Sequence, residues 1–209
     1  MTRVDPTLEY EKLLWAQGAR IVAGVDEAGR GAWAGPVFAA AVVLPTDERV
    51  CALLYGVRDS KQMTARQRER WQDCIKSASV AWAVASASHQ EIDELGILPA
   101  TYLAMQRTVR ALRNPPQHLL VDYVHIPNCS EPQTSLPKGD CLCLSIAAAS
   151  VLAKTARDAF MRALDAEYPG YGFSAHKGYG TARHRQALQE FGASAVHRKS
   201  FKPVAFLIN

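Results

Sequence analysis

Two apolar segments of the chain end in carboxylates. The segment 21–26 (IVAGVD) ends at Asp26 and is followed by Glu27, and the segment 118–122 (HLLVD) ends at Asp122. Short apolar runs rich in β-branched residues are typical of buried strands. A hydrophobic core does not accommodate unpaired charge, and ligand sites in α/β proteins form at the ends of strands. The two segments therefore predict a sheet with an acidic site at one edge.

A further acid, Asp140, follows Lys138-Gly139 directly before another apolar run. Neighbouring strand residues point to opposite faces, so we expect the strand to break at Glu27 if Asp26 and Glu27 are to converge. Carboxylates that meet repel one another unless cations lie between them, and oxygen ligands favour Mg²⁺ or Mn²⁺. Two such ions about 4 Å apart form the arrangement that hydrolyses phosphodiesters. Taken alone, the Asp26-Glu27 motif is better explained as an acidic helix cap or turn.

The rest of the pattern predicts strands and helices that alternate along the chain. Strands are expected at 37–44 and 80–87, and helices from about Asp5 to Gly18, at 64–77 behind a capping box, at 90–113 with an interruption at Gly96, at 145–167 with Ser145 as cap, and at 181–191, with an excursion loop at 123–139. This order predicts an α/β fold with a mixed sheet flanked by helices. We expect one domain over 1–209, with a sheet core at about 20–155 and a basic helical C-terminal extension at about 156–209.

Positive charge is concentrated in that extension. From Lys154 to Asn209 there are nine Lys or Arg against four Asp or Glu, in a chain of 209 residues with a net charge of +4. Glycines and aromatics are interleaved with these cations, for example around Tyr179, a combination suited to stacking on a sugar or base while cations hold phosphates. A solvated surface explains the charge equally well when it is taken alone. Asp158 is a further candidate acid, but it lies mid-helix, where an i,i+4 charge pair with Lys154 or Arg162 explains it at least as well.

Other residue types carry less information. The five cysteines have no metal-site spacing, and Cys141 and Cys143 are expected to share one face of a strand and to serve in packing. His176 and His184 are expected at the surface or in a structural role. No run approaches the roughly 18 apolar residues that span a bilayer, and the N-terminus lacks a signal-peptide pattern. These features predict a soluble cytoplasmic protein without a membrane partner.

Longer motifs carry a resemblance to a known family. The chain contains GVDEAGRG at 24–31, AGPV at 34–37, DSK at 59–61, KGD at 138–140, IAAASVLAK at 146–154, HKGY at 176–179 and HRKSF at 197–201. In content and order these motifs are similar to those of bacterial ribonuclease HII, over about residues 20–205. A dinucleotide-binding glycine motif is excluded, because the third glycine is absent and a strand follows instead of a helix.

The resemblance implies a ribonuclease H-like fold and a metal-dependent endonuclease. Such an enzyme cleaves the RNA strand of RNA–DNA hybrids and incises DNA 5′ of a single embedded ribonucleotide, leaving 3′-OH and 5′-phosphate ends. Its implied roles are the removal of ribonucleotides and of RNA primers. Its implied cofactor is Mn²⁺ or Mg²⁺, and its partner is nucleic acid.

The resemblance also assigns roles to residues by position. Asp26, Glu27, Asp122 and Asp140 are the implied catalytic and metal-binding carboxylates. Gly29, Arg30 and Gly31 are the implied segment that recognises the ribose 2′-OH, largely through backbone groups, and Tyr179 is the implied ring that stacks on the sugar after the junction. The implied phosphate contacts are Lys61, Lys154, Arg198 and Ser200.

The chain departs from the family pattern at three places. Ala32 replaces the usual proline and is expected to loosen the turn slightly. Tyr123-Val124-His125 replaces a Gly-Asn-Arg stretch and changes the surroundings of Asp122. Cys141 and Cys143 stand where small or polar residues are common.

Two alternatives remain open from the sequence. Ribonuclease HIII is a sister class, but its members carry Lys at the position of Arg30 and a further N-terminal domain. A non-catalytic hybrid-binding module would keep the basic face but would not need four carboxylates, whose charge opposes binding of a polyanion. Nothing in the sequence requires more than a monomer. The apolar tail 203–209 is expected to be a packed terminus, with docking to a processivity factor as the alternative.

Overall fold

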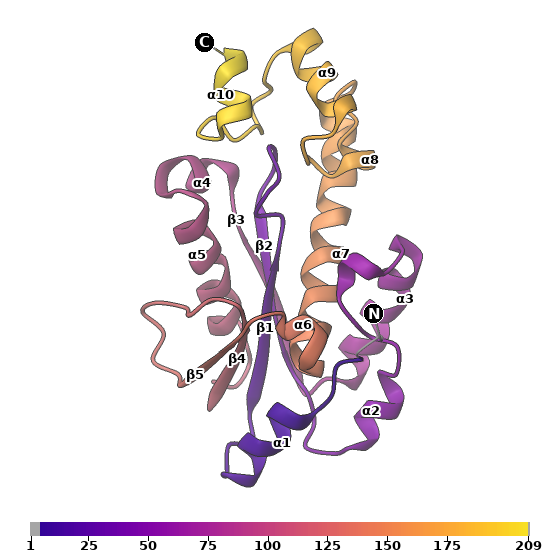
Figure 1. Ribbon diagram of the computed structural model, residues 1–209, viewed down its shortest axis with the longest axis vertical. Helices are drawn as coiled ribbons and strands as arrows, with labels where there is room; N and C mark the ends of the chain where they lie inside the picture. Colours follow the sequence, from indigo (N-terminus) through magenta and orange to yellow (C-terminus); the bar gives the residue numbers. More distant parts are fainter. Residues whose placement is uncertain (1–4, 209) are drawn as a thin grey trace.

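The protein is built around one five-stranded mixed sheet. The computed structural model describes residues 5–208, and its strands lie in the order β3-β2-β1-β4-β5 (Figure 1). Their bounds are β1 Val22–Ala28, β2 Val37–Val43, β3 Ala81–Ala87, β4 His118–Asp122 and β5 Gln133–Leu136. β1 pairs antiparallel with β2 and parallel with β4, so the carboxyl ends of β1 and β4 meet at the same edge of the sheet. The predicted mixed sheet is confirmed.

Helices account for most of the remaining described chain. Their bounds are α1 Glu9–Ala16, α2 Arg49–Leu53, the 3₁₀ turn η1 Ser60–Gln62, α3 Ala65–Ala78, α4 His89–Leu95, α5 Ile97–Arg110, α6 Gly139–Leu142, α7 Leu144–Glu167, α8 Phe173–His176, α9 Ala182–Phe191 and α10 Lys202–Ile208. The predicted capping box is present at the start of α3, where Thr64 and Gln67 satisfy each other's backbone amides. Gly96 separates α4 from α5 as expected.

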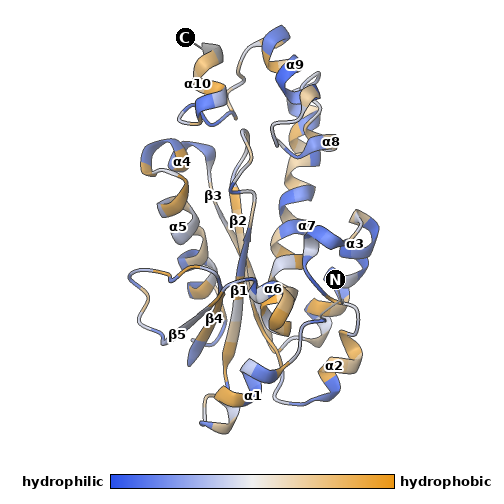
Figure 2. Ribbon diagram, viewed as in Figure 1, coloured by the Kyte–Doolittle hydropathy of each residue, from blue (hydrophilic) through white to orange (hydrophobic). Residues whose placement is uncertain are grey.

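Two apolar layers hold the helices on the sheet. α7 and α3 cover one face, and α5 covers the other (Figure 1). Figure 2 shows the apolar residues concentrated along the strands and on the inner sides of these helices. Gly24 lets β1 approach α7, because a Cβ atom there would lie 2.2 Å from the carbonyl carbon of Ser145. The polar end of β1 is therefore held directly beside α7.

The C-terminal extension packs onto the far end of the same long helix. A third apolar cluster joins Met161 and Leu164 of α7 to Phe173 of α8 and Leu188 of α9. α7 thus runs without interruption across the predicted division near residue 155. In α10, Val204 is buried and Phe206 is 81% exposed, so the described part of the tail packs only on one side. The side chains of residues 207–209 lie outside the described residues.

Three local predictions were wrong. The region 123–139 is not wholly a loop, because it contains β5, an edge strand whose half-exposed residues lack an apolar pattern. Ser145 does not cap α7. The carboxylate of Glu11, from α1, accepts a hydrogen bond of 2.8 Å from the Ser145 amide instead. Cys141 lies in α6 and Cys143 caps it, so the two thiols do not share a strand face.

No helix within the described range 5–208 combines the length and the apolar character needed to cross a bilayer.

Candidate active site

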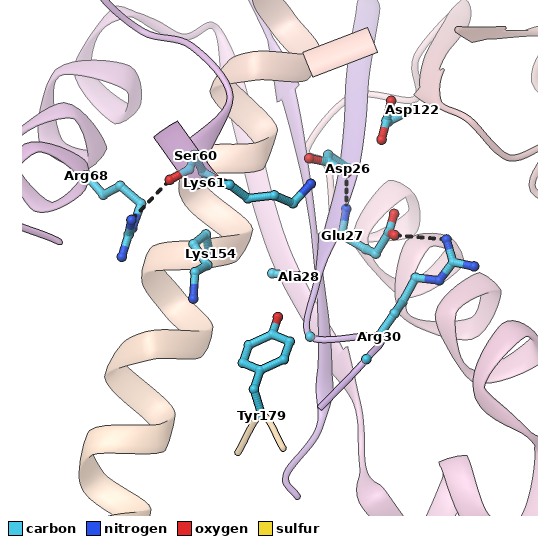
Figure 3. Close-up of a pocket in the computed structure, with 12 residues that line it drawn as sticks. Asp26, Glu27, Ala28, Arg30, Ser60, Lys61, Arg68, Asp122, Lys154 and Tyr179 are labelled. Atoms are coloured by element: carbon cyan, nitrogen blue, oxygen red, sulfur yellow. Dashed lines mark hydrogen bonds and ion pairs between the residues drawn. The ribbon is translucent and has the colours of Figure 1, made fainter. Parts of the chain in front are cut away.

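A pocket of about 610 Å³ opens where β1 ends (Figure 3). Nine of the residues singled out from the sequence line it, namely Asp26, Glu27, Gly29, Arg30, Gly31, Lys61, Asp122, Lys154 and Tyr179. A second pocket of about 540 Å³ adjoins it, shares Glu27, Arg30, Lys61 and Asp122 with it, and is also lined by Asp140. The two pockets together form one groove that brings ten of the twelve predicted residues together.

Asp26 and Glu27 reach this groove without the expected break in the strand. β1 continues through Glu27, which pairs with Ala39 of β2, to Ala28. The two side chains therefore leave opposite faces, and both line the pocket because it lies over the end of the strand. Burial, followed by the charges of Glu27 and Asp122, holds the pKa of Asp26 well above its usual range. The predicted break in the strand was wrong, but Asp26, Glu27 and Asp122 do lie together in the pocket.

Asp122 and Asp140 are joined by the start of α6. Asp122 Oδ1 accepts a hydrogen bond of 2.7 Å from the amide of Gly139, which fixes the residue before Asp140. A Cβ atom at Gly139 would lie 2.6 Å from Ile146 Cδ1, so a larger residue there would require the Ile146 side chain to move. Burial raises the pKa of Asp140, and the charges of Asp59 and Asp122 raise it further. Like charges thus accumulate at this edge of the sheet.

The donor set of the groove fits divalent cations. Its acids offer only carboxylate oxygens, the ligands that Mg²⁺ and Mn²⁺ prefer. Burial raises the pKa of Asp122 as well, against the hydrogen bond from the Gly139 amide, which lowers it. Counter-charge comes from Arg30, whose Nη1 lies 3.2 Å from Glu27 Oε1, and from Lys61, whose Nζ lies 3.9 Å from Asp140 Oδ2. Within the described residues, the three potential ligand atoms that lie within 4.8 Å of one another belong to Asp59, Asp140 and Cys141.

Cations line the side of the groove formed by α7 and α3. Lys154 Nζ donates to Asp158 Oδ1 at 2.5 Å, as expected from the i,i+4 spacing. Asp158 also accepts from Arg68 of α3 at 2.8 Å. Arg68 lines the pocket and was missed, because nothing in the spacing of α3 distinguishes it from the neighbouring arginines. Figure 3 shows Lys61 extending toward Asp26 from the opposite side to Asp122.

Two buried serines behind Asp26 were also missed. The hydroxyl oxygens of Ser60 in η1 and Ser150 in α7 lie 2.9 Å apart. A hydrogen bond from Ser150 lowers the pKa of Asp26, against the effect of burial. A lone serine in the apolar run 146–153 was the signal that could have revealed Ser150.

Tyr179 enters the pocket from the extension (Figure 3). Its ring lies 5.4 Å from the guanidinium carbon of Arg157 and 5.8 Å from Lys154 Nζ. Its backbone carbonyl accepts a hydrogen bond of 3.0 Å from His184 Nδ1. The rings of His184 and His176 stack at 4.4 Å, and both are buried. Of the two roles expected for these histidines, the structural one is therefore confirmed and the surface position is not.

Arg198 and Ser200 lie outside the groove. Arg198 is fully buried, and its guanidinium donates to the carbonyls of Gly29, Arg30 and Gly35. It is therefore not presented to a phosphate, contrary to the expectation. Ser200 is exposed, and its hydroxyl donates to Asp93 at 2.6 Å, on the side of α4.

The departures from the expected motif have local consequences. The amide of Ala32 donates to the carbonyl of Gly29 at 3.3 Å, a bond that proline could not make, so this turn gains a contact. Tyr123 is 68% exposed and has φ +62°, a conformation in which glycine is favoured. Cys143 does more than fill space, because its thiol donates to Glu11 at 3.1 Å.

The sequence was compared with known families and proteins. The family model of Ribonuclease HII matches residues 23–204. The chain belongs to the ribonuclease HII family. It is 53% identical over 202 residues to a Ribonuclease HII of Roseiflexus castenholzii, covering 95% of this chain and 89% of that one. It is 52% identical to a Ribonuclease HII of Anaeromyxobacter sp., covering 97% of this chain but only 63% of the relative's length.

Solved structures of ribonucleases H share the fold. The ribonuclease H2 of Pyrococcus horikoshii superposes with a TM-score of 0.74 at 26% identity, covering 89% of this chain and 96% of that one. Bst-RNase HIII, solved in complex with Mn²⁺, gives a TM-score of 0.65 at 19% identity, covering 91% of this chain and 70% of that one. The ribonuclease H-like fold is therefore confirmed. The HII match decides against the sister class that the sequence alone left open.

Proposed function

We propose that this ribonuclease HII homologue hydrolyses the RNA strand of RNA–DNA hybrids and cuts DNA 5′ of a single embedded ribonucleotide. The observation that carries the proposal is the groove itself. Its acidic end, formed by Asp26, Glu27, Asp122 and Asp140, adjoins the Gly29–Gly31 backbone and the ring of Tyr179. A cutting centre thus lies beside groups suited to detect a ribose. The 2′-OH is the chemical feature that distinguishes RNA from DNA at such a site.

The four carboxylates are the proposed ligands of Mg²⁺ or Mn²⁺. The chemistry gained when such ions are bound is stabilisation of negative charge on the attacking and leaving oxygens. The protein contributes the fixed placement of the ligands, through the pairing of β1 with β4 and the Gly139 amide bond to Asp122. Direct attack by water, leaving 3′-OH and 5′-phosphate ends, is the proposed course.

The remaining residues hold the substrate. Lys61 and Lys154 present ammonium groups to the groove from η1 and α7, and we assign them to phosphates on either side of the cut. Burial lowers the pKa of Lys154, and the hydrogen bond to Asp158 opposes that effect. Tyr179 offers its ring face to the sugar next to the junction.

Residues 1–209 are proposed to act as one unit, with the core and the extension joined through α7. Docking of a processivity factor to the tail would use the exposed Phe206 of α10. Loss of binding on Phe206→Ala, with unchanged cleavage of a short duplex, would support that role.

The test uses an end-labelled DNA duplex that contains one ribonucleotide. The protein is incubated with it in Mg²⁺ or Mn²⁺, with EDTA and the variant Asp26→Asn as controls. A single metal-dependent cut 5′ of the ribonucleotide supports the proposal. Cleavage of long hybrids alone would contradict the reading of a single 2′-OH, and tight binding without any cleavage would make the chain a hybrid-binding module.

A further inference from the structure

One buried guanidinium holds most of the turn that follows β1. Arg198 Nε donates to the Gly35 carbonyl at 2.9 Å, while Nη1 and Nη2 donate at 2.8 Å to the carbonyls of Arg30 and Gly29. The backbone amide of Arg198 also donates to the carbonyl of Trp33 at 2.8 Å. One residue, distant in sequence and with no exposed surface, therefore fixes four carbonyls between residues 29 and 35.

Fixing a carbonyl also fixes the amide that follows it. A peptide unit is planar and trans, so its N–H points away from its C=O. Arg198 holds the Gly29 and Arg30 carbonyls on its own side and thereby directs the N–H groups of Arg30 and Gly31 away from itself. Both residues line the groove. Within the described part of the chain, neither N–H group donates to another protein group.

Arg157, the second buried arginine near this turn, binds a different set of carbonyls. Arg157 donates to the carbonyls of Ala34, Pro36 and Lys177, outside the Gly29–Gly31 segment. It constrains the segment by close approach, because a Cβ atom at Gly29, where φ is +100°, would lie 1.9 Å from Arg157 Nε. Orientation of the two unpaired amides is therefore the work of Arg198.

We propose that Arg198 is a positioning residue for 2′-OH recognition, which orients the Arg30 and Gly31 amides toward the ribose and does not itself contact nucleic acid. This inference rests on the proposed function. Donors that are held in place before the substrate arrives lose little orientational freedom on binding, which makes each hydrogen bond count for more. Burial lowers the pKa of Arg198 to about 9, so the guanidinium is charged at neutral pH, and its three carbonyl partners satisfy its buried donors.

The charge-retaining variant Arg198→Lys tests this role. Lysine has one ammonium group and cannot reach three carbonyls in the fork geometry of arginine. Dissociation constants are measured in an Asp26→Asn background for two duplexes that differ only in one 2′-OH. We expect the ratio of the two constants to fall about tenfold, the value of roughly one well-formed hydrogen bond. The affinity for the all-DNA duplex and the salt dependence should stay unchanged.

A phosphate contact would give a different result. In that case both dissociation constants would rise by the same factor, because a phosphate contact is shared by the two duplexes, and their ratio would stay the same. That outcome would overturn the inference, and so would an unchanged ratio in Arg198→Lys. Equal binding of both duplexes by the protein with Arg198 intact would overturn the proposed function together with the inference.

Two further variants separate positioning from general damage. Arg107→Lys makes the same chemical change at an arginine that donates to the Ser86 carbonyl and to Glu91, away from the groove, and should leave the ratio unchanged. Phe201→Leu removes the ring that lies 5.1 Å from the Arg198 guanidinium and so loosens the placement of the group that makes these hydrogen bonds. If Arg198→Lys fails to fold, Phe201→Leu should still lower the ratio severalfold, and an unchanged ratio in it would overturn the inference.

Discussion

The hydroxyl groups of Ser60 and Ser150 form a hydrogen bond inside the protein and connect Asp26 to the turn that carries Lys61. Ser150 bonds to Asp26, and Ser60 directly precedes Lys61. Asp26, a proposed metal ligand, and Lys61, a proposed phosphate contact, are thus both held by the Ser60–Ser150 hydrogen bond.

Ser150→Ala should therefore lower kcat/KM about tenfold, because Asp26 loses a hydrogen-bond donor and Ser60 loses its buried partner. We expect stability to fall by only about 1 kcal/mol. Steady-state cleavage and thermal unfolding check the two effects. Ser79→Ala removes a hydroxyl that bonds to the Ile75 carbonyl at the end of α3 and serves as the control. Equal loss of activity in both variants would contradict a specific role for Ser150.

Asp26→Asn should abolish cleavage, by at least about 10³-fold, while binding of the duplex survives or strengthens. Stability should respond in the opposite sense. The pKa of Asp26 is raised, so at neutral pH its ionisation destabilises the metal-free protein. In EDTA the variant should unfold at a higher Tm than the parent, and added Mg²⁺ should raise the Tm of the parent more. Cleavage at the parental rate would exclude the four-carboxylate scheme.

Tyr179→Ala should impair incision at a single ribonucleotide more than cleavage of a long hybrid. A long hybrid offers many registers, whereas one ribonucleotide must be held at one place. Loss of stacking on one sugar or base amounts to about tenfold or more. Tyr179→Phe keeps the ring and should retain both activities. Matched loss on the two substrates would remove the junction role.

The histidine cluster should make stability depend on pH. Burial lowers the pKa of His184 and of His197 to about 4. Their Nε2 atoms lie 3.0 Å apart, so one of the two must remain unprotonated. Above pH 6.5 both the folded and the unfolded chains carry neutral rings. As the pH falls from 6.5 toward 4, only the unfolded chain gains protons, and stability is lost.

Thermal unfolding measured between pH 7.5 and 4 checks this prediction. Over this range the parent should lose at least about 1 kcal/mol more of its free energy of unfolding than His184→Gln. For a chain of this size, that is a difference of roughly 2–4 °C in Tm. The exposed His125 provides the control variant His125→Gln, whose curve should follow the parent. Parallel curves for the parent and His184→Gln would contradict the sign worked out above.

The sequence was most informative about features that depend only on residues close together in the chain. Apolar runs ending at Asp26 and Asp122 predicted the strands and their shared edge, and Thr64 with Gln67 predicted the start of α3. Such patterns depend on residues a few positions apart. A capping box and a strand-end carboxylate need no knowledge of distant contacts.

Features that depend on distant partners were missed or misread. The amide of Ser145 is satisfied by Glu11, from more than 130 positions away, so the local serine was taken for the cap. The cationic side chain of Arg198 was taken for a phosphate contact, because nothing in the sequence reveals that its partners are the carbonyls of Gly29, Arg30 and Gly35. Strand β5 escaped notice because an edge strand need not alternate apolar and polar residues.

The continuity of α7 has a consequence for where the cut falls. A helix of 24 residues is a stiff rod of about 36 Å. Its first half packs on β1 beside the carboxylates, and its second half anchors the extension that holds Tyr179. The rigid helix therefore fixes the distance between the carboxylates at the end of β1 and the ring of Tyr179. In the proposed function, that dimension would decide which phosphodiester is cut.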